Sequence, residues 1–191
     1  MNIVYHEKGK VFHLFNDRIS YIFMVLPHGG LGSLYYGKVL RDHEGFEHIF
    51  ERVHRGMTAC VFADCRDYSL DAIRQELPTY GSSDFRRPAL NVLQENGSRI
   101  LDMQYAGYRI VDGKPKLAGL PATYVESNDE AKTLIVEVQD ALTGLRAELL
   151  YTIFATGGAL ARSVRYINDG TEVLHLQKVM SMSIDLPDTE Y

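Results

Sequence analysis

The fold of this chain is decided by one polar stretch, Gln75-Glu76-Leu77-Pro78-Thr79-Tyr80-Gly81-Ser82-Ser83-Asp84-Phe85-Arg86-Arg87-Pro88-Ala89. Both prolines lack a backbone donor and bracket a segment that cannot be regular strand, and Gly81 supplies a turn. The residues on either side of the stretch have the composition of β-strands. We therefore expect an ordered loop between two sheet-forming parts of the chain.

Charged side chains in this stretch lie close enough in the sequence to form carboxylate–guanidinium forks, which would hold the loop in one shape. The predicted structural loop residues are Glu76, Tyr80, Asp84 and Arg86. The alternative is a solvated turn with incidental charges, because ion pairs at a surface contribute little stability.

The composition indicates one domain without a nucleic-acid or membrane partner. A chain of 191 residues with 46% hydrophobic residues can bury one core, and β-sandwiches often have this length. Its formal net charge of −5 argues against binding to phosphate groups or anionic lipids. No apolar run approaches the length of a membrane-spanning helix. We expect one domain over residues 1–191.

The chain is expected to be cytoplasmic. Met1-Asn2-Ile3-Val4-Tyr5-His6-Glu7 has no charged segment followed by an apolar one, as a secretory signal would have. The two cysteines, Cys60 and Cys65, fit neither a disulfide framework nor a CxxC pair, and we interpret them as reduced thiols.

Strand signals recur at short intervals on both sides of the polar stretch. Turn residues such as Asn16-Asp17, Glu95-Asn96-Gly97-Ser98 and Leu142-Thr143-Gly144 separate them and favour hairpins. The fold class predicted is all-β, a large antiparallel β-sandwich with a long elaborated loop region and little helix. The expected strands span 10–15, 19–26, 31–38, 90–93, 99–111, 132–138, 145–154, 161–167 and 173–184.

Residues 39–74 are the least sheet-like part, and any helix is expected between Asp42 and Gln75. Three histidines in this region, His43, His48 and His54, lack the spacing of a metal motif, so no metal site is predicted. Gly30-Leu31-Gly32 leads into strand rather than helix, so no nucleotide cofactor is predicted either.

Several motifs in order carry a family resemblance. They are Gln75 to Gly81 with Asp84-Phe85-Arg86, Gly113-Lys114-Pro115, Gly119 to Glu126, Asp140 to Leu145, Asn168-Asp169-Gly170 and Met182 to Asp188. Together they make nearly the whole chain resemble the N-terminal domain of glycoside hydrolase family 36 α-galactosidases. The resemblance implies a β-supersandwich that precedes a (β/α)8 catalytic barrel, packs on that barrel and takes part in homo-oligomer association.

The resemblance also implies the reaction of the whole enzyme, which is retaining hydrolysis of terminal α-galactosides such as melibiose and raffinose. In that family an aspartate nucleophile within a Lys-Trp-Asp pattern and an aspartate acid/base lie on the barrel. This chain contains no tryptophan, so neither role is carried over to any of its residues. No catalytic residue is predicted here, and the isolated chain is expected to be inactive.

One substrate contact is implied by the resemblance, in the loop from Arg52 to Arg66. Relatives place an acidic residue before an arginine there, reaching the sugar pocket of a neighbouring subunit. This chain has His54 followed by Arg55. A neutral imidazole donates and accepts, whereas a carboxylate only accepts. We predict a substrate contact only for His54, and interpret Arg66 and Arg86 as loop braces.

Two alternatives to the enzyme-domain interpretation stay open. The chain could be a stand-alone carbohydrate-binding or assembly module, which a reading frame without a barrel after Tyr191 would favour. It could also be a small hydrolase in its own right, although no Ser-His-Asp or Cys-His arrangement is evident.

Overall fold

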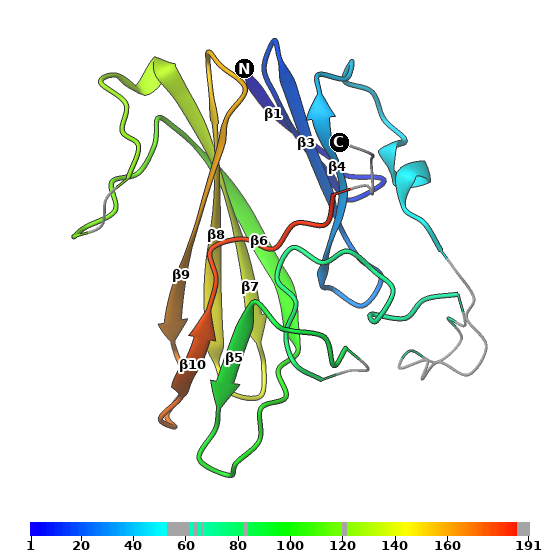
Figure 1. Ribbon diagram of the computed structural model, residues 1–191, viewed down its shortest axis with the longest axis vertical. Coiled ribbons are helices and arrows are strands. Elements are labelled where there is room, and N and C mark those ends of the chain that lie inside the picture. The colour runs from blue at the N-terminus through cyan, green and yellow to red at the C-terminus, as the bar shows by residue number, and fades with distance from the viewer. Residues whose placement is uncertain (53–61, 63–64, 66, 82–83, 120–121, 187–191) are drawn as a thin grey trace.

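The computed structural model describes residues 1–52, 62, 65, 67–81, 84–119 and 122–186. Two four-stranded antiparallel sheets pack face to face, and a two-stranded ribbon lies beside the second (Figure 1). This arrangement confirms the predicted all-β class. The described residues form only two short 3₁₀ helices, η1 (Phe46–Ile49) and η2 (Asn128–Glu130), neither of which could span a membrane.

The first sheet is a meander in which each strand pairs with the next along the chain. Its strands are β1 (Asn2–His6), β2 (Val11–Phe15), β3 (Ile19–Val25) and β4 (Leu31–Lys38). The predicted hairpin at Asn16-Asp17 is confirmed, with Phe15 opposite Ser20. Strand β1 was not among the strands expected from the sequence.

Both faces of the first sheet are covered. Phe12 and Leu14 point into the core between the sheets, whereas Val11 and Ile22 on the other face pack with Phe46 of η1. Residues 39–50 therefore form an ordered cover over the outer face of this sheet. Helix η1 lies in the window predicted for helix, and η2 does not.

The second sheet is also a meander. Its strands are β6 (Met103–Asp112), β7 (Ala131–Asp140), β8 (Leu145–Phe154) and β9 (Leu160–Asn168). Alternate residues of β7 and β8 face the first sheet, where Tyr151 stacks on Phe23 with ring centroids 4.7 Å apart. Aromatic stacking and aliphatic burial across this interface form the main hydrophobic core.

The third sheet corrects one prediction. Strand β5 (Leu90–Leu93) pairs with β10 (His175–Val179), and not with the segment that follows the turn at 95–98. Although Gln94 and Ser98 do form a turn, Leu101 N–H donates to Tyr80 and Asp102 N–H donates to the Asp140 carboxylate. The expected strand at 99–111 consequently begins only at Met103, and the one at 173–184 spans only β10.

Candidate functional site

The carboxylate of Glu76 lies buried between the two four-stranded sheets. Tyr21 of β3 donates its hydroxyl to both carboxylate oxygens, at 2.9 and 2.8 Å, and Tyr151 of β8 donates to Oε2 at 2.9 Å. Glu76 is 1% exposed, so these bonds have no water competing with them. One loop residue thus joins both sheets from the inside.

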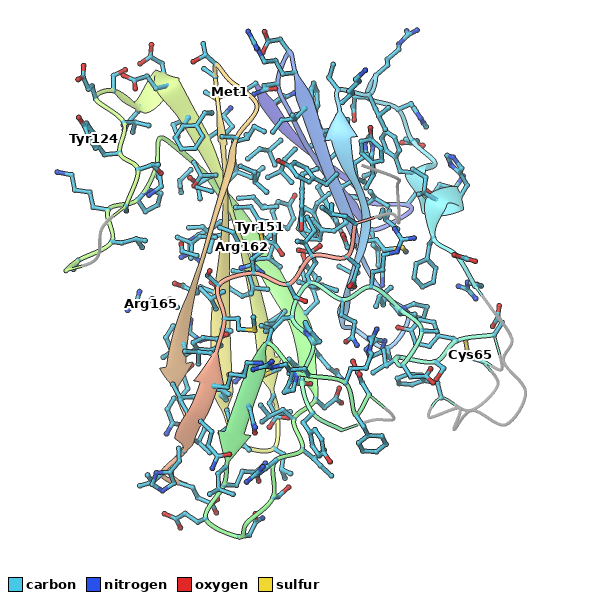
Figure 2. The ribbon with its side chains drawn as sticks, viewed as in Figure 1. Met1, Cys65, Tyr124, Tyr151, Arg162 and Arg165 are labelled. Carbon is cyan, nitrogen blue, oxygen red and sulfur yellow. The ribbon has the colours of Figure 1, made fainter. Side chains whose placement is uncertain are left out.

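Arg162 of β9 supplies a positive charge beside this carboxylate. Its guanidinium carbon lies 4.1 Å from the centroid of the Tyr151 ring, and Figure 2 shows both side chains in the middle of the molecule. Burial raises the pKa of Glu76, and Arg162 and the two tyrosine hydroxyls act against that shift. Burial also raises the pKa of Tyr21 and Tyr151, which keeps both hydroxyls protonated as donors.

The second predicted loop carboxylate, Asp84, receives a fork from Arg86. Arg86 Nε lies 2.9 Å from Oδ1, Nη2 lies 3.1 Å from Oδ2, and the Arg86 backbone N–H donates to Oδ1 at 3.1 Å. Gln75 Nε2 donates to Oδ2 at 2.6 Å. Side-chain exposure is 2% for Asp84 and 44% for Arg86, so only the carboxylate depends fully on its partners.

Arg86 also ties this loop to the segment before it. Its Nη2 donates to the carbonyl oxygens of Leu70 and Ile73 at 2.8 and 2.9 Å. Tyr80, the remaining predicted loop residue, is 37% exposed and packs its ring on Phe85 at 5.5 Å. Hydrogen bonds therefore surround Glu76, Asp84 and Arg86, whereas Tyr80 lies at the surface.

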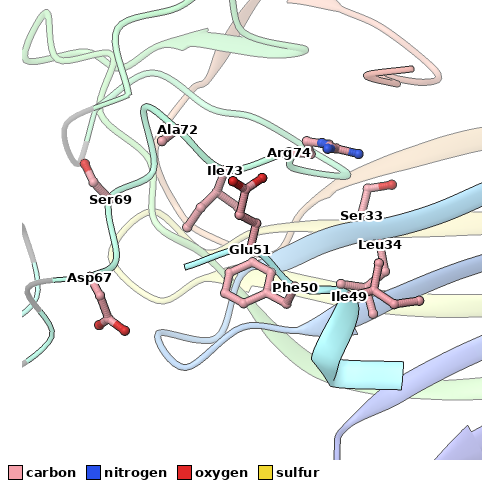
Figure 3. Close-up of a pocket in the computed structure, with 10 residues that line it drawn as sticks. All are labelled: Ser33, Leu34, Ile49, Phe50, Glu51, Asp67, Ser69, Ala72, Ile73 and Arg74. Atoms are coloured by element: carbon pink, nitrogen blue, oxygen red, sulfur yellow. The ribbon is translucent and has the colours of Figure 1, made fainter. Parts of the chain in front are cut away.

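A small cleft opens at the edge of the first sheet, where residues 49–51 and 67–74 meet β4 (Figure 3). Its volume is about 80 Å³. Carboxylates, hydroxyls, a guanidinium and an aromatic ring line it, including those of Ser33, Phe50, Glu51, Asp67, Ser69 and Arg74. At this volume the cleft can take a few water molecules or part of a larger ligand, which these hydrogen-bonding groups and the ring would contact.

The two segments that flank the stretch with His54 and Arg66 both line this cleft. Both of these residues lie outside the part of the chain that the structure describes. At the two flanks, Arg52 Nη1 lies 3.6 Å from Asp67 Oδ2, a half-exposed ion pair. His43 and His48 lie elsewhere, where the His43 ring is 4.2 Å from the Phe46 ring and 6.4 Å from the His48 ring.

Sequence reasoning did not identify Tyr21, Tyr151 or Arg162 as partners of Glu76. Each occupies a strand position that reads as ordinary sheet, and their meeting depends on how the two sheets stack. The available signal was Glu76 itself, an acidic residue followed directly by apolar Leu77 and Pro78.

The chain is similar to known proteins in sequence and in fold. The family model described as glycosyl hydrolase family 36 N-terminal domain matches residues 29–191. The chain is 42% identical to alpha-galactosidase AgaA of Geobacillus stearothermophilus over 191 residues, which covers all of this chain and 26% of that protein.

Two solved structures are also similar. The α-galactosidase of Lactobacillus brevis superposes with a TM-score of 0.92 at 34% identity, over 97% of this chain and 25% of that one. A variant of AgaA from Geobacillus stearothermophilus in complex with raffinose gives a TM-score of 0.88 at 43% identity, over 93% and 25%. The chain spans about a quarter of the length of these relatives.

Proposed function

This chain belongs to the N-terminal domain family of glycosyl hydrolase family 36, and from that membership we propose that it is the non-catalytic sandwich domain of an α-galactosidase. The complete enzyme would hydrolyse terminal α-D-galactosides such as melibiose and raffinose. A catalytic barrel outside residues 1–191 would supply the nucleophile and the acid/base.

The observation that carries this proposal is that the match to the α-galactosidase AgaA covers all of this chain but only 26% of AgaA. The hydrogen bonds of the buried carboxylates agree with a non-catalytic role. Glu76 and Asp84 are occupied by tyrosine, glutamine and arginine donors, as structural groups are. A retaining glycosidase instead needs two carboxyl groups about 5–5.5 Å apart that flank an open substrate site.

Exposed apolar side chains support packing against the catalytic barrel. They lie on and around β10, and comprise Val173, Leu176, Val179 and Met180. A row of this kind is typical of a surface that another domain covers. We assign it to the barrel of the same chain.

Homo-oligomer association and a contribution to the substrate pocket are further parts of the proposal. The segment around Tyr124 projects from the second sheet, and Tyr124 is 77% exposed (Figure 2). It would serve subunit association. The cleft lined by Glu51, Asp67 and Arg74 would lie at the rim of the galactoside pocket, with His54 contacting the sugar. The cytoplasmic location stays a prediction.

A domain exchange tests the proposal. We would replace the matching segment of AgaA with residues 1–191 and assay hydrolysis of an aryl α-galactoside. The chimera should be active, AgaA without its N-terminal segment should not, and the 191-residue chain alone should show no turnover. Turnover that is proportional to the concentration of the isolated chain and survives repurification would contradict the non-catalytic role.

Binding measurements separate the alternative of a stand-alone carbohydrate module. Calorimetric titration of the isolated chain with raffinose should give no saturable heat, because the pocket proposed here is completed by the barrel. Saturable binding to the isolated chain would favour the module. In the active chimera, His54→Ala should raise KM more than it lowers kcat, since it removes a contact to the bound sugar.

A further inference from the structure

Three side chains with metal-ligand chemistry converge on the outer face of the first sheet. His6 Nε2 lies 3.0 Å from Asp42 Oδ1, and His13 Nδ1 lies 2.7 Å from the same oxygen. The three ligand atoms lie within 4.8 Å of one another. No sequence motif marks them, because they come from β1, β2 and the segment after β4.

The sheet register explains why the two imidazoles share a face. His13 is directly opposite Val4, and His6 lies two residues further along the same strand as Val4. Because side chains alternate between faces, His6 and His13 are diagonal neighbours on one side of the sheet. Phe12 and Leu14, on the opposite side of β2, point into the core between the sheets.

The His13 ring is held in place by its second nitrogen. His13 Nε2 lies 2.8 Å from Ser20 Oγ, and Ser20 Oγ accepts the Leu40 N–H at 2.9 Å. His13 is fully buried, so its orientation cannot relax into solvent. Histidines that bind metals have such a partner on the other ring nitrogen, which fixes the tautomer and the ring plane.

We propose that His6 Nε2, His13 Nδ1 and Asp42 Oδ1 form a binding site for a divalent transition metal of the Zn²⁺ type. Two imidazoles and one carboxylate suit borderline cations, and three protein ligands leave one position open. Metal–ligand bonds of about 2.0–2.2 Å in a tetrahedral site hold the ligand atoms about 3.3–3.6 Å apart, so Asp42 Oδ1 would have to move away from the two nitrogens by roughly half an ångström or more. In the neutral tautomer required for metal binding, the coordinating nitrogen of each ring carries no proton and the other ring nitrogen does. On His13 that other nitrogen, Nε2, donates its proton to Ser20.

An aromatic ring shields the proposed metal site on one side, and a cavity opens beside it on another. The Phe46 ring lies 5.0 Å from the His13 ring and 6.2 Å from the His6 ring, which limits the access of water. A cavity of about 210 Å³ opens beside His6 and is also lined by Lys8, Gly9, Glu44 and Glu47. Its two carboxylates outnumber its one ammonium, so its mouth favours a cation.

The competing interpretation is a permanent hydrogen-bonded triad without metal. Asp42 would then only anchor the cover of residues 39–50 to β1 and β2. Calorimetric titration of the untagged, chelator-treated chain with ZnCl₂ distinguishes the two, and Co²⁺ absorption in the visible range reports the coordination geometry. The metal site predicts saturable uptake of one Zn²⁺ per chain and the intense d–d bands of a four-coordinate Co²⁺ ion.

Three variants complete the test. Asp42→Asn and His6→Ala should each weaken Zn²⁺ binding by more than about tenfold. His48→Ala, which removes an exposed histidine of η1, should leave the affinity unchanged. Circular dichroism checks that each variant is folded, and Asp42→Asn preserves the shape of the ligand if His6→Ala does not fold. Absence of saturable binding in the parent, or binding that only His48→Ala removes, would overturn the proposal. No outcome depends on α-galactosidase activity.

Discussion

Tyr151 of β8 donates its hydroxyl to the Glu76 carboxylate at 2.9 Å, and Tyr21 donates to that carboxylate from the opposite sheet. The contact between the sheets is therefore polar at its centre, inside a mainly hydrophobic core. Removing an acceptor shared by two buried donors leaves both hydroxyls unpaired, at about 1–3 kcal/mol each. Stability at this point depends on the protonation state of Glu76.

The first prediction concerns the pH dependence that Glu76 confers. Its pKa is raised in the folded state, so the folded protein binds this proton more tightly than the unfolded chain does. That stabilisation is fully present below the ordinary value of 4.5 and is lost as pH rises through the folded pKa. Each unit of difference between the two pKa values corresponds to about 1.4 kcal/mol.

Glu76→Gln should therefore be most costly below pH 4.5, and its free energy of unfolding should approach that of the parent as the pH rises to neutrality. Urea unfolding across this range measures the difference. Glu126→Gln, at an exposed position, is the matched control and should differ from the parent equally at every pH. A constant deficit for Glu76→Gln would contradict the expected linkage.

The second prediction concerns the fork between Asp84 and Arg86. Arg86→Ala leaves a buried carboxylate without its cation and should cost about 3–5 kcal/mol. Asp84→Ala leaves a half-exposed guanidinium that can reach water, so its cost should be smaller, about 1–3 kcal/mol. Denaturant midpoints measure both, and the double variant should lose less than the sum of the two.

Arg87→Ala is the control for this pair, because Arg87 is exposed in the same loop. It should stay within about 0.5 kcal/mol of the parent. If Asp84→Ala and Arg86→Ala also stay within that margin, residues 75–89 form a solvated turn, and their assigned role as braces is wrong.

The third prediction concerns Asn16, which joins the β2–β3 turn to the second sheet. Its Nδ2 donates to the carbonyl oxygens of Phe154 and Gly157, at 3.0 and 2.8 Å, and its Oδ1 accepts two backbone N–H groups. Asn16→Asp keeps the acceptor but places a carboxylate against two carbonyls. We expect a loss of about 2 kcal/mol or more in unfolding free energy.

Asn96→Asp is the matched control, since the Asn96 side chain only accepts a bond from Ser98 N–H in an exposed turn. It should be nearly neutral. Equal effects of the two substitutions would mean that the link from Asn16 to the second sheet contributes no stability.

The fourth prediction concerns acid sensitivity at His28. Burial lowers the pKa of His28, with a smaller opposing effect of Asp102, so the unfolded chain binds this proton more tightly. Stability should decrease as pH falls through the ordinary value of 6.5 toward the folded pKa. Protonation also removes the lone pair that Nδ1 offers to the Tyr68 hydroxyl.

His28→Gln should flatten the pH dependence of the unfolding free energy between about pH 5 and 7, whereas His175→Gln, at an exposed position, should not. Urea unfolding at half-unit intervals of pH tests this. An unchanged slope in His28→Gln would assign the acid sensitivity to other groups.

The sequence predicted the parts of the fold that short connections determine. Alternating side chains and the turns at Asn16-Asp17 and Leu142-Thr143-Gly144 define hairpins without reference to the rest of the molecule, and the structure contains both. The turn at Gly144 also depends on a close approach, because a Cβ on Gly144 would lie 2.7 Å from Gly170 N. Here local chemistry and the final fold agree.

Sequence reasoning failed where pairing partners are distant. Turn chemistry at 95–98 was sufficient to predict a turn but not a hairpin, since the residues after it bind Tyr80 and Asp140 instead. The strand at Asn2–His6 has little apolar alternation to mark it. The bonds of Glu76 and the convergence of His6, His13 and Asp42 likewise depend on sheet packing, for which a single sequence has no direct signal.

The pairing of β5 with β10 has a consequence for the order of folding. In each four-stranded meander neighbouring strands pair with one another, and all of these pairings except that of β6 with β7, which residues 113–130 connect, close short loops and can form early. Leu90 of β5, by contrast, can pair with Val179 of β10 only late, because Val179 leaves the ribosome after the entire second sheet has been synthesised. Until then β5 has an unpaired edge, so the nascent domain is most vulnerable to misassociation during the last part of its own translation.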